Sequence, residues 1–172
     1  MPATSRTARA CALALAGLGV TASTLTALPA TAASGDSQTT STRTVAQRTS
    51  SRVLSAKDIA LHQRGDAYAY GAAGPDRFDC SGLVFYSFRR AGFPVPRTSG
   101  AQAGFARRIA KPDMRAGDLM FFYGSGGVYH AAIFLAWSHG HAVMVHSPGS
   151  GQRVQIAVPW TSRWFGGTLR RR

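Results

Sequence analysis

The sequence predicts an α+β domain in which helices come before an antiparallel sheet. Helical patterns with capping residues and glycine or proline stops occupy the chain from Ser55 to about Arg107. From Asp118 onward the pattern changes to short apolar or alternating segments rich in Val, Ile and aromatic residues, which is typical of strands. The connections between these segments contain glycine and are short enough for hairpins. Helices followed by hairpin-linked strands indicate an α+β architecture.

The first 32 residues have the composition of a secretory signal peptide. Residues 1–10 carry Arg6 and Arg9 without an acid, and residues 11–20 are apolar. A Thr/Ala-rich stretch then ends in Ala30-Thr31-Ala32, which fits a small-residue cleavage site. The apolar run is too short to span a bilayer comfortably. We therefore expect residues 1–32 to be removed and the mature protein to be secreted and extracellular.

The next segment, 33–53, is rich in Ser, Thr, Ala and Gln and has almost no apolar periodicity. It is predicted to be a disordered linker. The remaining residues, 54–172, suffice for one compact domain. Within them, Ser55-Ala56-Lys57-Asp58 resembles a capping box that would open a helix ending near Gly65.

Removal of the signal peptide would leave one cysteine, Cys80, in the run Phe78-Asp79-Cys80-Ser81-Gly82-Leu83-Val84. Asp79 can N-cap a helix that continues to Gly92, which places Cys80 in the first turn. The partial positive charge of the helix N-terminus is expected to stabilise a thiolate there and to lower the thiol pKa. By residue type alone a buried structural cysteine is the commoner case. The Asp-Cys-Ser-Gly context favours a nucleophile instead.

The elements predicted after this helix are one short helix and a series of strands. Thr98 or Ser99 can cap the short helix, which would run through Arg107. The strands are expected at residues 118–123, 129–136, 142–147, 153–158 and 164–169.

Two histidines are candidates for a general base and its partner. His130 begins one predicted strand and His146 ends the next, and in a hairpin these two ends lie side by side. We expect His130 to take the proton of Cys80 and His146 to hydrogen-bond the far nitrogen of His130. Two unrelated strand histidines would give the same spacing, so spacing alone leaves that interpretation open.

Composition excludes several classes of function and suggests a partner. The chain contains neither Glu nor Asn, which removes the His-Glu-x-x-His zinc peptidases and the glycosidases that need a Glu acid. The formal charge is +13, and loss of Arg6 and Arg9 with the signal peptide lowers it by two, to +11. Such a charge suggests a polyanionic partner. No nucleic-acid motif is present, so anionic wall polymers or a membrane surface are the expected partners of the Arg-rich surface.

Several segments together resemble the NlpC-type cell-wall cysteine peptidases. The resemblance covers roughly Ser55 to Val158, and its segments in combination are specific to that family. In chain order they are Tyr68-Ala69-Tyr70-Gly71, the Cys80 run above, Pro96-Arg97-Thr98-Ser99, Ala116-Gly117-Asp118-Leu119-Met120-Phe121-Phe122, Tyr129-His130-Ala131-Ala132-Ile133-Phe134-Leu135 and Met144-Val145-His146-Ser147-Pro148.

This resemblance implies a papain-like α+β fold and hydrolysis of the peptide stems of peptidoglycan through a thioester. The bond usually cut in the family joins γ-D-glutamate to a diamino acid. No cofactor or metal is expected, and the protein is expected to be a monomer associated with the cell wall. The implied site consists of Cys80 as nucleophile, His130 as base, His146 as orienting residue, Tyr68 as a hydroxyl near the oxyanion, and Asp79 and Ser81 beside the oxyanion and substrate.

Three alternatives stay open at the level of sequence. The same acyl-enzyme could pass its acyl group to an amine, which would make the protein an acyltransferase. Cys80, His130 and His146 could instead hold zinc with an open coordination position, as in a zinc-dependent hydrolase. The third alternative is a non-catalytic cell-wall-binding module that uses the Arg-rich surface.

Overall fold

The computed structural model describes residues 36–171, with side chains from residue 41 onward, so the expected signal peptide at 1–32 lies outside the described residues. Among the described helices, none is both long enough and apolar enough to cross a membrane. The elements in chain order are α1 (Asp36–His62), β1 (Ala67–Tyr68), β2 (Arg77–Phe78), α2 (Cys80–Arg90), α3 (Ser99–Phe105), β3 (Arg107–Ile109), the 3₁₀ turn η1 (Lys111–Asp113), β4 (Leu119–Gly124), β5 (Gly127–Ser138), β6 (His141–His146), β7 (Gln155–Ala157) and β8 (Trp164–Thr168).

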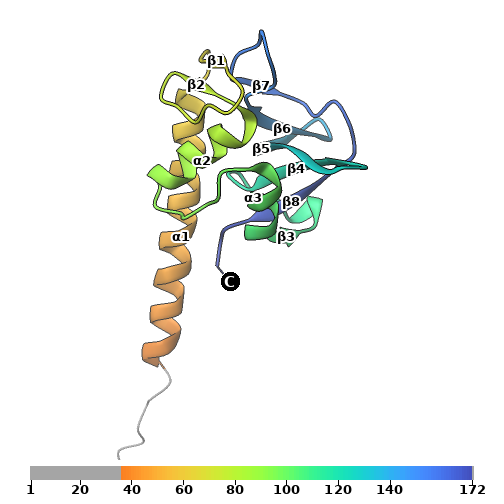
Figure 1. The fold of residues 1–172 in the computed structure, drawn as a ribbon. Coiled ribbons are helices and arrows are strands. Elements are labelled where there is room, and N and C mark those ends of the chain that lie inside the picture. Colours follow the sequence, from red (N-terminus) through yellow and green to blue (C-terminus); the bar gives the residue numbers. More distant parts are fainter. Residues whose placement is uncertain (1–35, 172) are drawn as a thin grey trace, which may run out of the picture. The chain divides into compact units, whose positions relative to one another are not determined.

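The helices precede a six-stranded antiparallel sheet, which confirms the predicted α+β class (Figure 1). The strand order is β3-β8-β4-β5-β6-β7, so the four strands from β4 to β7 form consecutive hairpins. β8 returns to pair with β4, and β3 adds an edge strand that the sequence did not predict. A small parallel pair, β1 with β2, was also missed, because each strand has only two residues and no readable period.

The sheet has an apolar layer on each face because its side chains alternate. Leu119 and Phe121 of β4 point toward the helices, where they join a cluster with residues of α1 and α2. Met120 and Phe122 of the same strand point to the opposite face and pack in a second cluster with Trp164 of β8. Burial on both faces explains why β4 reads as a continuous apolar run.

The first helix corrects the expected disordered linker at 33–53. Its described part, residues 36–53, is entirely helical and runs without interruption into the segment predicted as the first helix. The compact unit therefore includes the described residues before position 54, and the proposed capping box at Ser55 lies inside a helix.

Packing against the end of α2 stabilises the C-terminal end of this polar segment. Val53 is completely buried in the core. Beside it, the Arg52 guanidinium donates hydrogen bonds to the carbonyl oxygens of Ala91 and Gly92 and lies over the ring of Phe93 at 4.5 Å. These contacts come from tertiary structure, and the low apolar content of 33–53 gave no local sign of them.

We predict that Val53→Ala lowers the free energy of unfolding by about 2 kcal/mol, because it deletes two buried methyl groups and leaves a cavity. Leu54→Ala is the matched control, since Leu54 is the next residue of α1 and is 41% exposed, and it should cost less than about 0.5 kcal/mol. Urea unfolding of the full chain measures both. Equal effects of the two substitutions would mean that α1 is not part of the cooperative core.

Candidate active site

The sulfur of Cys80 is positioned by the N-terminus of α2, which is capped by Asp79 as predicted. The Asp79 side chain accepts the Gly82 N–H at 2.6 Å, and its backbone is extended, as an N-cap requires. The same carboxylate also accepts the Gly71 N–H at 2.9 Å and the Ser81 hydroxyl at 3.1 Å. The residue before Cys80 is therefore fixed to both the helix and the preceding loop.

Arg97 completes this arrangement and was not singled out as a site residue by the sequence reasoning. Its guanidinium forms a two-pronged ion pair with Asp79, at 2.6 Å and 3.0 Å. It also donates to the Ser81 hydroxyl at 2.9 Å and to the Ala72 carbonyl at 3.1 Å. The available signal was its place in Pro96-Arg97-Thr98-Ser99, one of the segments that carry the family resemblance.

A cleft of about 450 Å³ opens beside Cys80, which is itself only partly buried. Such a cleft gives a peptide access to the sulfur. Three tyrosines and several polar residues line the cleft, and the full lining is Tyr68, Tyr70, Gly71, Asp79, Cys80, Ser81, Arg97, Thr98, Ser99, Val128 and Tyr129.

The structure brings the two predicted histidines together. His130 on β5 and His146 at the end of β6 are both buried, and His130 Nε2 lies 3.0 Å from His146 Nδ1. The sulfur of Cys80 is within hydrogen-bonding reach of the backbone N–H of Ala131, the residue after His130. Because His146 occupies the Nε2 side of the His130 ring, Nδ1 is the nitrogen left for the thiol.

A bulge in β5 puts the two imidazoles on one face of the sheet. Near the hairpin turn Ala136 pairs with Val143, but one step further the register shifts and Phe134 pairs with Met144. Side chains alternate between faces, so a shift of one residue moves a whole strand segment to the opposite face. Without the bulge, His146 would point to the helix side of the sheet, away from the His130 ring.

The protonation states differ from the expected thiolate. Burial raises the pKa of the Cys80 thiol above its ordinary value of 9.0, and this outweighs the lowering by the Ala131 N–H. The prediction of a lowered thiol pKa is therefore wrong. Burial and the neighbouring His146 lower the pKa of His130 to about 3, and burial lowers that of His146 to about 4. Near neutral pH the site holds a neutral thiol and two neutral imidazoles.

The three residues expected around the oxyanion all line the cleft, but they differ in what they can do. Burial raises the pKa of Tyr68, as does the neighbouring Cys80, so its hydroxyl stays protonated and can donate. Burial alone would raise the pKa of Asp79, but the hydrogen bonds from Arg97 and Gly82 lower it below 3.8. Asp79 is therefore an ionised acceptor that cannot stabilise an oxyanion. Ser81 already hydrogen-bonds Asp79 and Arg97, so both residues position the site.

Trp160, in the segment between β7 and β8, is a site residue that sequence reasoning missed. Its ring lies 5.1 Å from that of His130 and 5.7 Å from that of His146, and it stacks on Phe122 at 4.5 Å. Within the described chain, His146 Nε2 is buried without a hydrogen-bond partner. Trp160 thus covers one side of the imidazole pair, and this cover contributes to the burial that lowers both pKa values. No local pattern around Trp160 indicates this role.

The histidine geometry does not fit a metal site. Over residues 36–171, no three His, Cys, Asp or Glu side chains converge in a way that could hold a metal ion. At 3.0 Å, His130 Nε2 and His146 Nδ1 are hydrogen-bonded to each other, which leaves no space for a metal between them. The arrangement instead suits nucleophilic acyl transfer, since the Cys80 thiol lines an open cleft and lies next to the backbone N–H of Ala131, the residue that follows the paired His130.

Comparison with known proteins gives one family. The model of the NlpC/P60 family matches residues 65–171. A protein named probable endopeptidase from Mycobacterium tuberculosis (strain ATCC 25618 / H37Rv) is 41% identical over 103 residues, which cover 60% of this chain and 25% of that protein. This chain thus spans about a quarter of the length of that relative.

Two solved structures share the fold. The NlpC/p60 domain of the peptidoglycan hydrolase SagA matches with a TM-score of 0.61 and 27% identity, covering 68% of this chain and 98% of that one. A Mycobacterium tuberculosis protein described as a non-catalytic NlpC/p60 domain, adapted to peptidoglycan binding, matches with a TM-score of 0.56 and 26% identity, covering 69% of this chain and 97% of that one.

We predict that Trp160→Ala raises the pKa of both histidines from about 3 and about 4 toward the ordinary value of 6.5, because water reaches the uncovered rings. Since the imidazoles then protonate at higher pH, less of the neutral base is present at pH 5. Histidine NMR titration measures the shift. Trp160→Phe keeps an aromatic cover and is the control; unchanged pKa values in Trp160→Ala would show that the indole shields neither ring.

We also predict how the alkylation rate of the Cys80 thiol depends on pH. Alkylation of Cys80 by iodoacetamide should rise continuously through pH 9, because the thiol pKa lies above 9.0 and thiolate is scarce below it. The control is Cys80→Ala, because any alkylation of that variant of the full chain comes from Cys11. A plateau of rapid alkylation between pH 5 and pH 7 would instead reveal a thiolate–imidazolium pair and contradict a neutral resting site.

Proposed function

The chain belongs to the NlpC/P60 family, and from this membership we propose that it is a secreted endopeptidase that hydrolyses peptide stems of peptidoglycan through a Cys80 thioester. The observation that carries the proposal is the hydrogen bond between His130 and His146, together with the position of the Cys80 sulfur next to the backbone N–H of Ala131, which follows His130. The proposed bond is the amide between γ-D-glutamate and a diamino acid. Relatives named endopeptidase and peptidoglycan hydrolase support the substrate class.

The first half of the proposed reaction forms the thioester. As the Cys80 sulfur attacks the scissile carbonyl carbon, its proton passes to Nδ1 of His130. The carbonyl oxygen becomes an oxyanion, which the Cys80 backbone N–H and the Tyr68 hydroxyl can stabilise. The C–N bond then breaks, and His130 returns the proton to the leaving amine.

In the second half, His130 removes a proton from water, and the resulting hydroxide attacks the thioester carbonyl. The C–S bond breaks, the product leaves as a carboxylic acid that ionises in water, and the proton held by His130 returns to the Cys80 sulfur. His146 Nδ1 accepts a hydrogen bond from the Nε2–H of His130, which leaves Nδ1 of the resting His130 ring unprotonated and free to take the thiol proton. The lowered pKa of His130 supports this role, because the ring is neutral and able to accept a proton near pH 7.

Export and wall association are part of the same proposal. Their support is the signal-like composition of residues 1–32 and the formal charge of +13 on the chain. An extracellular location would give the enzyme direct access to peptidoglycan.

We predict that the purified protein releases stem peptides from sacculi and that Cys80→Ala abolishes release, because no other described residue supplies the nucleophile. His146→Ala should lower kcat/KM by about 10²–10⁴-fold, since the imidazole of His130 loses its orienting partner. His62→Ala is the matched control, because His62 is an exposed histidine on α1, and it should leave the rate unchanged. Mass analysis of the fragments identifies the bond.

The alternatives give different results in the same assay. Loss of activity with a chelator and retention with a thiol alkylator would favour the zinc hydrolase. Fragments that carry an added amine would indicate acyl transfer. Wall binding without fragments from the intact protein would make it a binding module, as described for one structural relative.

A further inference from the structure

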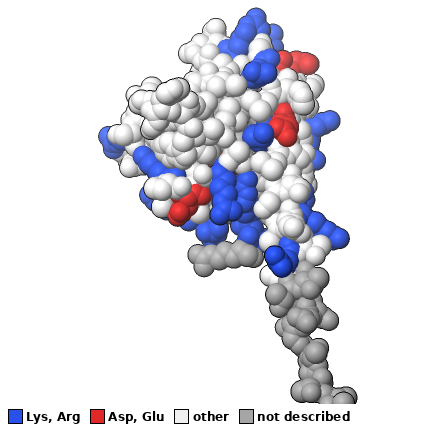
Figure 2. All heavy atoms as spheres, turned by 180° about the vertical axis from the view of Figure 1, so that it is seen from behind, with Lys and Arg blue, Asp and Glu red and all other residues white. Residues whose placement is uncertain are grey.

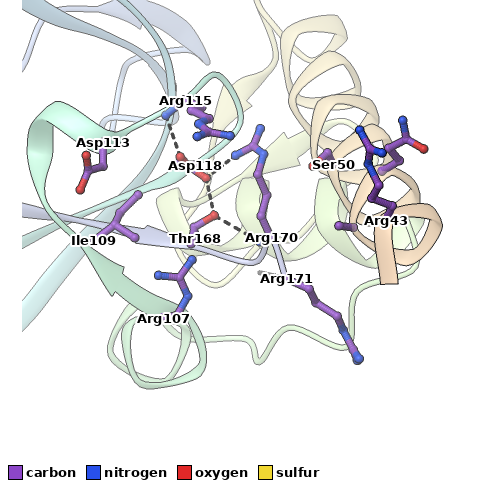
Figure 3. Close-up of a pocket in the computed structure, with 12 residues that line it drawn as sticks. Arg43, Ser50, Arg107, Ile109, Asp113, Arg115, Asp118, Thr168, Arg170 and Arg171 are labelled. Atoms are coloured by element: carbon purple, nitrogen blue, oxygen red, sulfur yellow. Dashed lines mark hydrogen bonds and ion pairs between the residues drawn. The ribbon is translucent and has the colours of Figure 1, made fainter. Parts of the chain in front are cut away.

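A second concave site lies away from the Cys80 cleft and is lined by arginines from four parts of the chain. Its volume is about 490 Å³, and none of its lining residues also lines the cleft. In Figure 3 the lining side chains come from α1, β3, the loop before β4 and the segment after β8; Arg115 and Arg170 lie beside Asp118, whereas Arg171 points away from it. The arginines are Arg43, Arg107, Arg115, Arg170 and Arg171. We call this site the arginine pocket.

The floor of the arginine pocket is fixed by a buried carboxylate. Asp118 accepts the Arg115 backbone N–H at 2.7 Å and the Thr168 hydroxyl at 2.6 Å, and it forms an ion pair with Arg170. Arg170 also donates to the carbonyl of Ala116. The charges of Asp118 and Arg170 therefore compensate each other, and this pair is part of the structure rather than a vacant site.

The rim of the arginine pocket is different, because its charges are uncompensated. Within residues 36–171, the guanidinium groups of the other four arginines make no hydrogen bond, ion pair or ring contact, and all four residues are exposed. The only other acid in the lining is Asp113, so the lining contains five arginines and two aspartates and has a formal excess of three positive charges. Figure 2 shows Lys and Arg side chains gathered on the lower part of the back face. Mutual repulsion of these groups costs free energy that a bound anion would relieve.

The residue type points to phosphate as the anion. A guanidinium presents several N–H donors in a planar fork that matches the oxygens of a phosphate group, whereas an ammonium acts as a point charge. Every cation in the lining is an arginine, and no lysine is present.

The shape points to a polymer rather than a single ion. A neighbouring depression of about 580 Å³ shares Arg107, Thr168, Arg170 and Arg171 with the arginine pocket and extends it to Arg52 near the end of α2. Two adjoining basic depressions can hold successive charges of one chain. A polyanion also gains from release of its counterions when several charges are neutralised together.

We propose that the arginine pocket binds a phosphodiester-bearing polymer of the cell wall. The choice of a wall polymer rests on the proposed peptidoglycan function, whereas the phosphate chemistry follows from the pocket itself. Because the two sites share no lining residue, the polymer can remain bound while a stem peptide occupies the Cys80 cleft. Such tethering raises the effective concentration of the enzyme at its substrate.

The first experiment titrates sodium polyphosphate into the full-length protein by calorimetry. Arg107→Gln/Arg115→Gln should weaken binding by about ten-fold, as expected for loss of two charge-assisted contacts. The control is Arg48→Gln/Arg77→Gln, which removes the same charge at exposed positions outside both depressions and should change affinity less than about two-fold. Equal weakening in both variants would mean that overall charge governs binding. No weakening in either variant would exclude the arginine pocket as the binding site of polyphosphate.

A second experiment identifies the source of the phosphate. Walls that keep their phosphodiester polymers should retain the protein, and walls stripped of them by hydrofluoric acid should not. Phosphatidylglycerol vesicles are the competing surface. If Arg107→Gln/Arg115→Gln lost binding to the vesicles but kept its binding to walls, the proposal that the arginine pocket binds a wall polymer would be overturned. Cys80→Ala should bind like the wild type, so failure of the peptidase proposal stays distinguishable from failure of this one.

Discussion

The carboxylate of Asp79 is buried where three segments of the chain meet, and the position of Cys80 depends on it. It accepts five hydrogen bonds, from the backbone N–H groups of Gly71 and Gly82, from the Ser81 hydroxyl and from both terminal nitrogens of Arg97. A buried charge is tolerated only when it is paired and hydrogen-bonded, so these donors must come together for the domain to fold. The loop before β2, the start of α2 and the segment before α3 are thereby fixed around Cys80.

This constraint gives a physical reason for each residue of the Asp-Cys-Ser-Gly run. Asp79 caps the helix and binds Arg97, while Ser81 bridges the two charged groups. At Gly82 a side chain would collide with the carbonyl oxygen of Ala72, which itself accepts the Asp79 N–H at 2.9 Å. Only Cys80 has a side chain that is not used to hold this structure. The other residues of the run therefore hold the Cys80 sulfur in a fixed position.

Much of this could be predicted from the sequence, because the signals were local. The Asp79 cap, the Thr98 cap and the hairpin strands follow from residue type and spacing, and the structure has all of them. What was missed depends on contacts between distant segments. The helix over 36–53 is stabilised by packing, and the cover by Trp160 comes from a segment that follows β7. The sign of the Cys80 pKa shift was wrong because burial, which a sequence does not display, outweighs the backbone donors at the helix start.

The predicted pairing of His130 and His146 is correct, but its physical cause is a register shift that the spacing of the histidines does not reveal. Spacing placed His130 and His146 at neighbouring strand ends, but the side chains share a face only because β5 shifts register by one residue between Phe134 and Ala136. A hairpin of the same length without that bulge would separate the rings by the thickness of the sheet. The bulge is therefore as necessary for the contact between the two imidazoles as the histidines themselves. A sequence search that scores residue types alone would accept a chain in which the same histidines face opposite sides and the thiol has no oriented base.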